Sequence, residues 1–342
     1  MEVRKIDSPE QIMVLCKRLP LPIQFAWCAE APVVAFRLMG KERVVLKAHQ
    51  GAALAVAFAP DGGRLLSAGK DRAVRLWDPE SLEKTGEFNG HSSAVHTLTF
   101  DASGRYLASG SANAVRIWEY PGGELKKELS GESIVAFGPT DHHLGTIAAP
   151  SQTANKPVSG EAAPGAQVTL WDARDLSVLR RFEHVDRRHQ SLAFAPNGAV
   201  LFIGGSGPIH RVSLPEGTLE GIQLGHQIGV SHIVPSPKGS VLASTGTDGT
   251  LYFWTVVGGD RVHSISMDVS SGPGGFPLAF GPDGRTVVVG CGSQTRLYNA
   301  PDGFLRKTLV TGAEVHDVAI SPDGRRVANA CGDGDVRIFE LS

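Results

Sequence analysis

The sequence has few cysteines and no long apolar run. The 342 residues include four cysteines and no Cys-X-X-Cys pair: Cys16, Cys28, Cys291 and Cys331. Zinc-ligand spacing is therefore missing, and a disulfide framework is not expected in a chain of this length. No stretch approaches the roughly 20 apolar residues that a membrane span needs, and the charged N-terminus lacks the apolar segment of a signal peptide. We expect a cytoplasmic protein that does not contact a membrane.

Charge of one sign is also lacking. The chain has 33 lysines and arginines against 35 aspartates and glutamates, a formal net charge of −2, and no long run of either sign. A nucleic-acid surface needs a concentration of basic residues, so this class of partner is not expected. The signatures of a nucleophile elbow, a zinc protease, a phosphate-binding loop and a dinucleotide-binding fold are missing as well. We predict no catalytic residue, no metal and no cofactor.

Glycine, by contrast, is abundant, and its 41 residues indicate many tight turns and therefore many short strands. One phrase recurs along the chain: an alternating apolar strand, then a turn built from Pro or Ser, Asp or Asn, and Gly. Asp-Gly and Asn-Gly supply the positive φ that a tight hairpin requires. Seven copies occur, at Leu54–Gly62, Val95–Gly104, Ile134–Asp141, Ser191–Gly198, His232–Gly239, Pro277–Gly284 and Asp317–Gly324.

Each copy leads into a second strand of small and branched residues, and then into a third strand that ends in an aromatic residue or its substitute. The third-strand positions recur roughly every forty residues, at Trp77, Trp118, Trp171, Val212, Trp254, Tyr298 and Phe339. This period, four strands per unit, a Gly-His start and a Trp-Asp end resemble the WD40 repeat family, and the Pro-Asp-Gly turns are similar to its bacterial members. The resemblance implies an all-β fold, a seven-bladed β-propeller over residues 43–342.

In that family a histidine, a serine or threonine on the second strand, an aspartate in the next turn and the tryptophan form a buried hydrogen-bonded tetrad. The resemblance implies two complete tetrads here: His49, Ser67, Asp71 and Trp77, and then His226, Ser244, Asp248 and Trp254. The second repeat keeps His91, Ser109 and Trp118 but has Ala112 and Asn113 where the aspartate is expected. The fourth and sixth repeats have lost most of the set. We therefore expect blades of uneven stability within one fold.

The parts outside the repeats carry separate predictions. The last repeat ends on its third strand, so we expect the N-terminal strand at residues 43–47 to complete the last blade. Residues 1–42 are predicted to be an extension with a short amphipathic helix, which begins at Ser8-Pro9-Glu10-Gln11, followed by a strand pair. We expect this extension to pack as a cap beneath the propeller, and an eighth, degenerate blade and a partner-docking arm remain alternatives. The insertion at residues 149–166 is rich in Pro, Ala, Gly and Ser, and is either a mobile loop without a function or a binding loop.

A rigid disc whose frame repeats while its loops vary suits protein binding. The resemblance implies a non-enzymatic scaffold that binds protein or peptide partners on the faces of the propeller, as a subunit of a multi-protein assembly. Candidate partner-binding residues lie in loops and at the channel mouth: His96, Arg187, Arg188, His189, His232, Phe276 and His316. Two alternatives from other classes remain open. One is a metal-dependent hydrolase or lyase that uses the histidines of the innermost strands, and the other is a nucleic-acid-associated subunit of a complex.

Overall fold

The structure is a computed structural model that describes residues 23–26, 35–38, 44–140, 143–148, 167–183, 191–205, 208–214, 217–222, 226, 229–267 and 275–341. Apart from turns, the regular structure of these residues is β-strand. They contain no helix that is long and apolar enough to cross a membrane.

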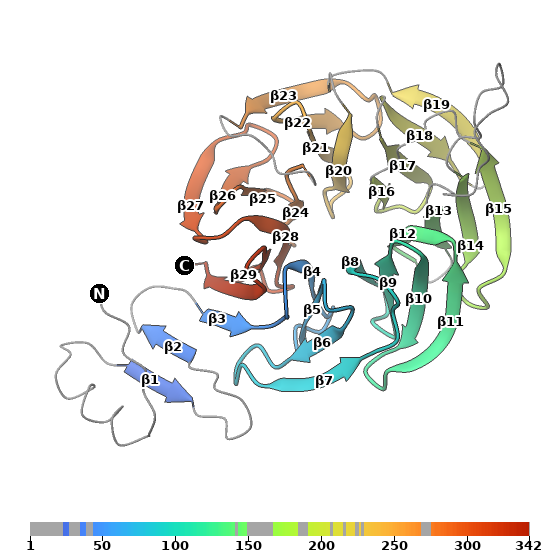
Figure 1. The fold of residues 1–342 in the computed structure, drawn as a ribbon. Coiled ribbons are helices and arrows are strands. Elements are labelled where there is room, and N and C mark those ends of the chain that lie inside the picture. The colour runs from blue at the N-terminus through green and yellow to red at the C-terminus, as the bar shows by residue number, and fades with distance from the viewer. Residues whose placement is uncertain are drawn as a thin grey trace, which may run out of the picture.

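The strands form seven four-stranded antiparallel sheets arranged as blades around a central axis (Figure 1). Blade 1 consists of β4 (Ala53–Phe58), β5 (Leu65–Gly69), β6 (Val74–Trp77) and β7 (Lys84–Phe88). Blade 2 consists of β8 (Val95–Phe100), β9 (Tyr106–Ser111), β10 (Ala114–Glu119) and β11 (Glu124–Ser130). Blade 3 consists of β12 (Glu132–Phe137), β13 (His143–Ala148), β14 (Gln167–Asp172) and β15 (Val178–Glu183). Blade 4 consists of β16 (Ser191–Phe194), β17 (Val200–Gly204), β18 (Ile209–Ser213) and β19 (Thr218–Ile222). Blade 5 consists of β20 (Val230–Pro235), β21 (Val241–Gly246), β22 (Thr250–Thr255) and β23 (Arg261–Ser266). Blade 6 consists of β24 (Leu278–Phe280), β25 (Thr286–Cys291), β26 (Gln294–Asn299) and β27 (Leu305–Val310). Blade 7 consists of β28 (Val315–Ile320), β29 (Arg326–Cys331), β30 (Asp335–Glu340) and β3 (Val44–Lys47).

The hydrophobic core lies between the blades. Each of the seven apolar clusters joins two adjacent blades, including one that joins blade 7 to blade 1. The second strands β5, β17, β21 and β25 are buried along their whole length, which explains their continuous runs of small and branched residues. A single blade leaves both faces of its sheet exposed, so the ring must close for any blade to be stable.

The ring closes through a strand that precedes blade 1 in the sequence. β3 pairs with β30, with Val44 opposite Ile338 and Lys47 opposite Asp335. The backbone N–H of His49 extends this contact by donating to the carbonyl of Gly334 at 2.9 Å. Lys47 Nζ lies 2.8 Å from the buried carboxylate of Asp335. The last sheet is thus built from both ends of the repeat region, and its outer strand is held by backbone pairing together with one ion pair.

Replacing Asp335 is expected to loosen this closure. Asp335 is 3% exposed and also lies 3.5 Å from the guanidinium of Arg337, itself buried. Asp335→Ala should lower the free energy of unfolding by about 1–2 kcal/mol, because Arg337 keeps Asp333 as its second partner and only part of its pairing is lost. Urea denaturation measures the change. The exposed Glu83→Ala serves as a control, and an equal effect of the two substitutions would contradict the assignment of Asp335 to the closure.

Before the propeller, β1 (Ile23–Ala26) and β2 (Ala35–Leu38) form an antiparallel pair with Ile23 opposite Leu38. They lie within the two apolar segments for which the sequence predicted a strand pair. The predicted helix lies in residues 1–22, outside the described residues. The insertion at residues 149–166 also lies outside them, and it joins β13 to β14.

Candidate functional site

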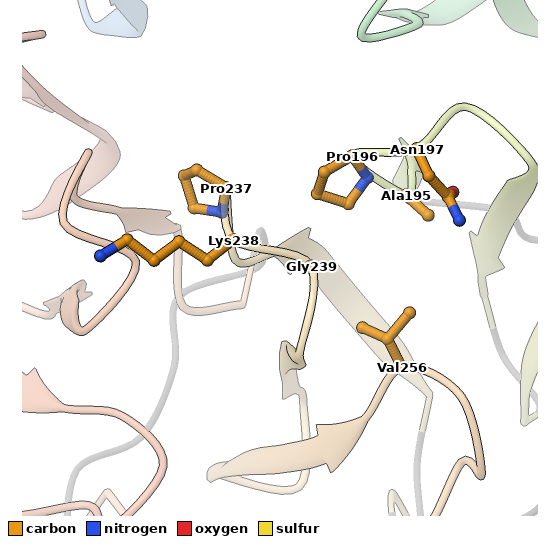
Figure 2. Close-up of a pocket in the computed structure, with 7 residues that line it drawn as sticks. All are labelled: Ala195, Pro196, Asn197, Pro237, Lys238, Gly239 and Val256. Carbon is orange, nitrogen blue, oxygen red and sulfur yellow. The ribbon is translucent and has the colours of Figure 1, made fainter.

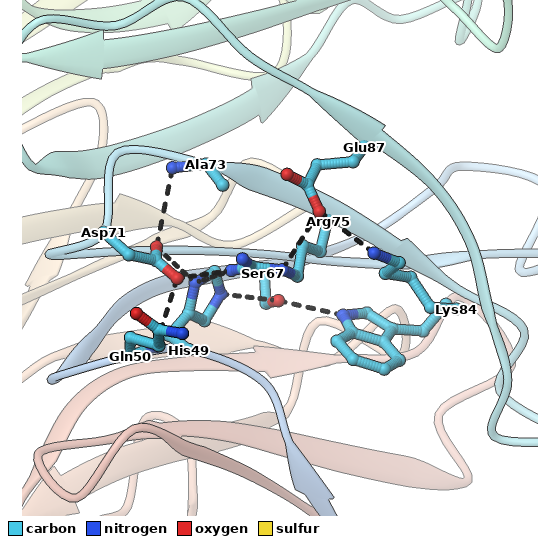
Figure 3. Close-up of polar contacts among 9 residues, drawn as sticks. His49, Gln50, Ser67, Asp71, Ala73, Arg75, Lys84 and Glu87 are labelled. Atoms are coloured by element: carbon cyan, nitrogen blue, oxygen red, sulfur yellow. Dashed lines mark hydrogen bonds and ion pairs between the residues drawn. The ribbon is translucent and has the colours of Figure 1, made fainter. Parts of the chain in front are cut away.

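The tetrad of blade 1 is a continuous chain of hydrogen bonds (Figure 3). Trp77 Nε1 donates to Ser67 Oγ at 2.9 Å, and Ser67 Oγ lies 2.8 Å from His49 Nε2. His49 Nδ1 in turn lies 2.8 Å from Asp71 Oδ1. Since the ionised carboxylate of Asp71 can only accept, the imidazole carries its proton on Nδ1, and Nε2 accepts from the serine hydroxyl. The chain joins β5, β6 and the segment before β4 into one rigid end of the blade.

The charges of this tetrad follow from burial and pairing. Burial lowers the pKa of His49 despite the opposing influence of Asp71, so the imidazole is neutral at pH 7. Burial alone would raise the pKa of Asp71, but hydrogen bonds from His49 and Arg75 outweigh it and lower that pKa. Arg75 Nη1 donates to Asp71 Oδ2 at 2.6 Å, and the backbone N–H of Gln50 donates to the same oxygen at 3.1 Å. With the backbone N–H of Ala73, which donates to Oδ1 at 3.5 Å, four donors hold one ionised carboxylate.

Blade 5 repeats the arrangement. His226 Nε2 lies 2.9 Å from Ser244 Oγ, which accepts a 2.8 Å hydrogen bond from Trp254 Nε1. His226 Nδ1 lies 3.1 Å from Asp248 Oδ1. The ring of Tyr252 packs edge-on against that of His226, with 4.7 Å between centroids. Both tetrads implied by the family resemblance are therefore joined by hydrogen bonds.

Blade 2 has the tetrad without its carboxylate. His91 Nε2 lies 2.6 Å from Ser109 Oγ, and Trp118 Nε1 donates to the same oxygen at 2.8 Å. His91 Nδ1 is buried and has no hydrogen-bond partner among the described residues. Burial lowers the pKa of His91 to about 4. Asn113, which the sequence aligns with the aspartate, is exposed and does not fill the place.

Blade 3 replaces the histidine with a glutamate that sequence reasoning missed. Glu132 is buried at the start of β12, and its Oε1 accepts a hydrogen bond from Thr169 Oγ1 at 3.3 Å. Thr146 takes the serine position and accepts from Trp171 Nε1 at 2.8 Å. Burial raises the pKa of Glu132, against hydrogen bonds from Thr146 and Thr169. The Gly-Glu at residues 131–132, where other repeats have Gly-His, is the one signal that pointed to this exchange.

The channel-mouth candidates have different surroundings. His96 is exposed, whereas His232 and His316 are partly exposed. Burial lowers the pKa of His232 to about 4, so this side chain is neutral at physiological pH. No group of three or more His, Cys, Asp or Glu side chains within the described ranges is arranged to hold a metal ion.

Phe276 corrects the sequence prediction. We expected it as a contact residue at the channel mouth, but its side chain is 0% exposed. It packs with Phe253 and Met267 in the core between blades 5 and 6, and its carbonyl accepts a 2.6 Å hydrogen bond from Thr245 Oγ1. A side chain used in this core cannot reach a partner, so Phe276 is a structural residue. The remaining candidates Arg187, Arg188 and His189 lie outside the described residues and stay predictions.

The described turns between the first and second strands lie at one end of the blades, here called the turn face. It lies opposite the tetrads, because each first strand runs from the tetrad end to its turn. Turn glycines lie beside the proline of the neighbouring turn, so that a carbon added at Gly104 would lie 3.5 Å from Pro60 and one added at Gly324 would lie 3.4 Å from Pro282. Six prolines mark this face: Pro60, Pro139, Pro196, Pro237, Pro282 and Pro322.

A groove of about 380 Å³ opens on the turn face between blades 4 and 5 (Figure 2). Two proline turns and one residue after β22 line it: Ala195, Pro196, Asn197, Pro237, Lys238, Gly239 and Val256. Beside it, Val257 is 83% exposed, the highest value among the large apolar residues of the described part. The lining of the groove combines apolar prolines with the polar side chain of Asn197 and the positive charge of Lys238. Sequence reasoning missed it because its two turns are forty residues apart and meet only when the blades pack.

Comparison with known families gives four matches to the WD domain, G-beta repeat, at residues 40–78, 82–119, 217–255 and 304–340. Together with the seven four-stranded blades, these matches decide the family. The chain belongs to the WD40-repeat family. The prediction of an all-β, seven-bladed WD40 propeller is thereby confirmed.

Two curated proteins resemble parts of this WD40 protein. Topless-related protein 4 of Arabidopsis thaliana is 28% identical over 190 residues, which cover 52% of this chain and 17% of that protein. Eukaryotic translation initiation factor 3 subunit I of Pyricularia oryzae is 33% identical over 58 residues, 17% of each chain. The matches thus span about a sixth of the length of both relatives. By its name, the second of them is a subunit of a larger factor.

Proposed function

We propose that this WD40 protein is a non-enzymatic scaffold of a cytoplasmic multi-protein assembly, which binds protein partners on the faces of its disc. The groove between blades 4 and 5 carries the proposal. Its two prolines and the neighbouring Val257 offer apolar area to a partner, and Asn197 and Lys238 offer polar groups. Apolar surface left exposed at a concave place on a rigid frame is typical of protein-binding sites. The family and the subunit status of one relative support the same function.

The closed ring explains why such a site binds without rearranging. Pro196 and Pro237 have fixed φ angles, and the turns that carry them are tied by backbone hydrogen bonds, Gly198 N–H to Ala195 and Gly239 N–H to Ser236, both at 2.8 Å. The walls of the groove therefore have their shape before a partner arrives. Binding to a preformed surface avoids the entropic cost of ordering a loop.

A substitution beside the groove tests this function. Val257→Asp places a charge on the exposed apolar rim, and it should weaken partner capture about tenfold or more without changing the melting temperature, since Val257 has little buried surface to lose. Tagged wild-type and variant proteins would be purified from their native cell, and co-purifying proteins quantified by mass spectrometry. Val262→Asp, on the exposed outer strand β23, is a matched control that should retain the partner.

The double charge reversal Arg187→Glu and Arg188→Glu tests the loop candidates in the same experiment. Loss of the partner here but not with Val257→Asp would move the site to that loop. A protein that is captured alone in every sample, or with stoichiometric nucleic acid instead of a protein, would contradict the scaffold function.

A further inference from the structure

The carboxylate site of blade 1 has a counterpart in blade 2 that lacks the carboxylate. In blade 1 the donors to Asp71 are His49 Nδ1, the guanidinium of Arg75, and the backbone N–H groups of Gln50 and Ala73. The strand registers place Ser109 of blade 2 in the position of Ser67, and Arg116 in that of Arg75. His91 bonds to Ser109 as His49 does to Ser67. Blade 2 therefore retains the histidine and arginine that hold the carboxylate in blade 1.

A shorter hairpin removes the carboxylate itself. In blade 1 the residues between Gly69 and Ala73 are Lys70, Asp71 and Arg72, whereas blade 2 has only Ala112 and Asn113 between the equivalent Ser111 and Ala114. The deletion tightens the turn and takes away the aspartate. Ala112 and Asn113 are exposed, as is Ser92 on the other side, so the place lies at the molecular surface.

The retained histidine of blade 2, His91, can donate a hydrogen bond to an acceptor. His91 is 6% exposed, and its Nδ1 has no partner within the described residues. As in blade 1, where the ionised Asp71 can only accept, an acceptor at His91 Nδ1 places the imidazole proton on Nδ1, and Nε2 then accepts from the Ser109 hydroxyl, which itself accepts from Trp118. A buried nitrogen that is left without a partner destabilises the protein, and an acceptor that binds there recovers this loss.

Arg116 supplies the positive charge beside this donor. Its guanidinium packs so closely against Gly90 that a carbon added there would lie 1.9 Å from Nη1. Nε and Nη2 engage Glu128 at 2.8 and 2.7 Å. The same sharing occurs in blade 1, where Arg75 Nε lies 3.3 Å from Glu87 while Nη1 bonds Asp71. An arginine in this position thus holds two carboxylates at once, and Arg116 has one.

We propose that this place on blade 2, formed by His91, the backbone of Ser92 and Arg116, binds the side-chain carboxylate of an aspartate or glutamate from a partner protein. It rests on the proposed scaffold function and adds the partner's chemistry: an acidic residue on the surface that docks against the face opposite the groove. The incoming carboxylate takes the position that Asp71 holds in blade 1. A charged contact of this kind fixes the orientation of the partner, whereas other residues of the interface supply most of the buried area.

A turn graft tests the proposal. Replacing Ala112-Asn113 by the blade 1 sequence Lys-Asp-Arg supplies the carboxylate from the protein itself, and a Lys-Asn-Arg graft is its matched control. The probe is the peptide acetyl-Gly-Ser-Glu-Ser-Gly-amide, with the glutamine peptide as its control, added to protein labelled in its histidine rings. NMR follows the Nδ1–H signal of His91.

We expect the glutamate peptide to shift the His91 signal saturably in the wild type and in the Lys-Asn-Arg graft. The shift should be absent with the glutamine peptide, with Arg116→Gln, and in the Lys-Asp-Arg graft, whose His91 signal should already resemble that of His49. A wild-type shift that the glutamine peptide matches, or one that survives the Lys-Asp-Arg graft, would overturn the proposal. If the peptide causes no such shift but affinity purification still captures a partner, only the site on blade 2 is refuted. If the peptide shifts the signal but no partner is captured, only the scaffold function is refuted.

Discussion

Ser244→Ala is expected to lower the free energy of unfolding by about 2–4 kcal/mol, an unusually large effect for the loss of one hydroxyl group. The hydroxyl is the centre of the blade 5 tetrad, where it links Trp254 Nε1 at 2.8 Å and His226 Nε2 at 2.9 Å. Trp254 is 1% exposed, so water cannot replace the lost partner. Each buried polar group left unpaired costs about 1–3 kcal/mol, and this substitution leaves two.

Chemical denaturation of the two proteins measures the difference. Ser240→Ala is the matched control, because Ser240 is an exposed serine of the same blade that precedes β21. Asp248→Ala should have a smaller effect of about 1–3 kcal/mol, since the donors that lose their partner are His226 Nδ1 and the backbone N–H of the partly buried Thr250. Equal stabilities of the Ser244 and Ser240 variants would show that the tetrad does not stabilise blade 5.

Asp317→Asn is expected to make the protein more stable at pH 8 and to leave its stability at pH 4 almost unchanged. Asp317 lies on the innermost strand β28, where its carboxylate accepts hydrogen bonds from the backbone N–H groups of Val56 and Val318, both at 2.9 Å. Burial raises the pKa of Asp317 from 3.8 to about 7, and the two backbone donors oppose this shift only in part. Asparagine keeps the oxygen that accepts from Val56 and removes the charge.

The direction of the pH dependence follows from proton binding. A carboxyl group with a pKa that is higher in the folded chain binds more protons when folded, so its contribution is full below pH 3.8 and is lost as the pH rises through 7. The wild type therefore loses this contribution over the range, and the variant has no such contribution to lose. Because Asp317 keeps some contact with solvent, we expect a difference of about 1–2 kcal/mol between pH 4 and pH 8.

Asp323→Asn is the control for this pH series. Asp323 is an exposed turn residue whose pKa is lowered by hydrogen bonds from Ser321 and the backbone of Arg325. Its substitution should give no gain at pH 8. Thermal melts of the three proteins from pH 4 to pH 8 make the comparison, and parallel curves for wild type and Asp317→Asn would contradict the raised pKa.

The architecture could be predicted from the sequence because each blade carries its own copy of the signal. The turn phrase marks the first hairpin seven times, and Trp77, Trp118, Trp171 and Trp254 mark the third strand, so no single departure hides the period. The hydrogen-bonded residues of blades 1 and 5 follow for the same reason. The four residues of each tetrad lie within one repeat, and the family pattern indicates which of them form hydrogen bonds with one another.

The surfaces depend on packing between repeats, which a local pattern does not contain. Phe276 occupies the repeat position of the exposed His96, yet it precedes the short strand β24 and turns into the core between blades 5 and 6. Alternation along a strand cannot assign a side chain that stands before the strand begins. The groove has the same origin, because Pro196 and Pro237 belong to different blades. Glu132 was missed since an acid replaces a histidine, and only the fold shows it buried beside Thr169.

Hydrogen–deuterium exchange of the protein with and without its co-purified partner tests the central claim most directly. The scaffold account predicts that the partner slows exchange at residues 195–198, 236–239 and 256–259, the two turns and the loop around the groove. Backbone amides of the buried second strands, such as those of β21, should not change. Slowed exchange confined to the innermost strands that line the channel, with the groove unaffected, would contradict it and place the functional site in the channel.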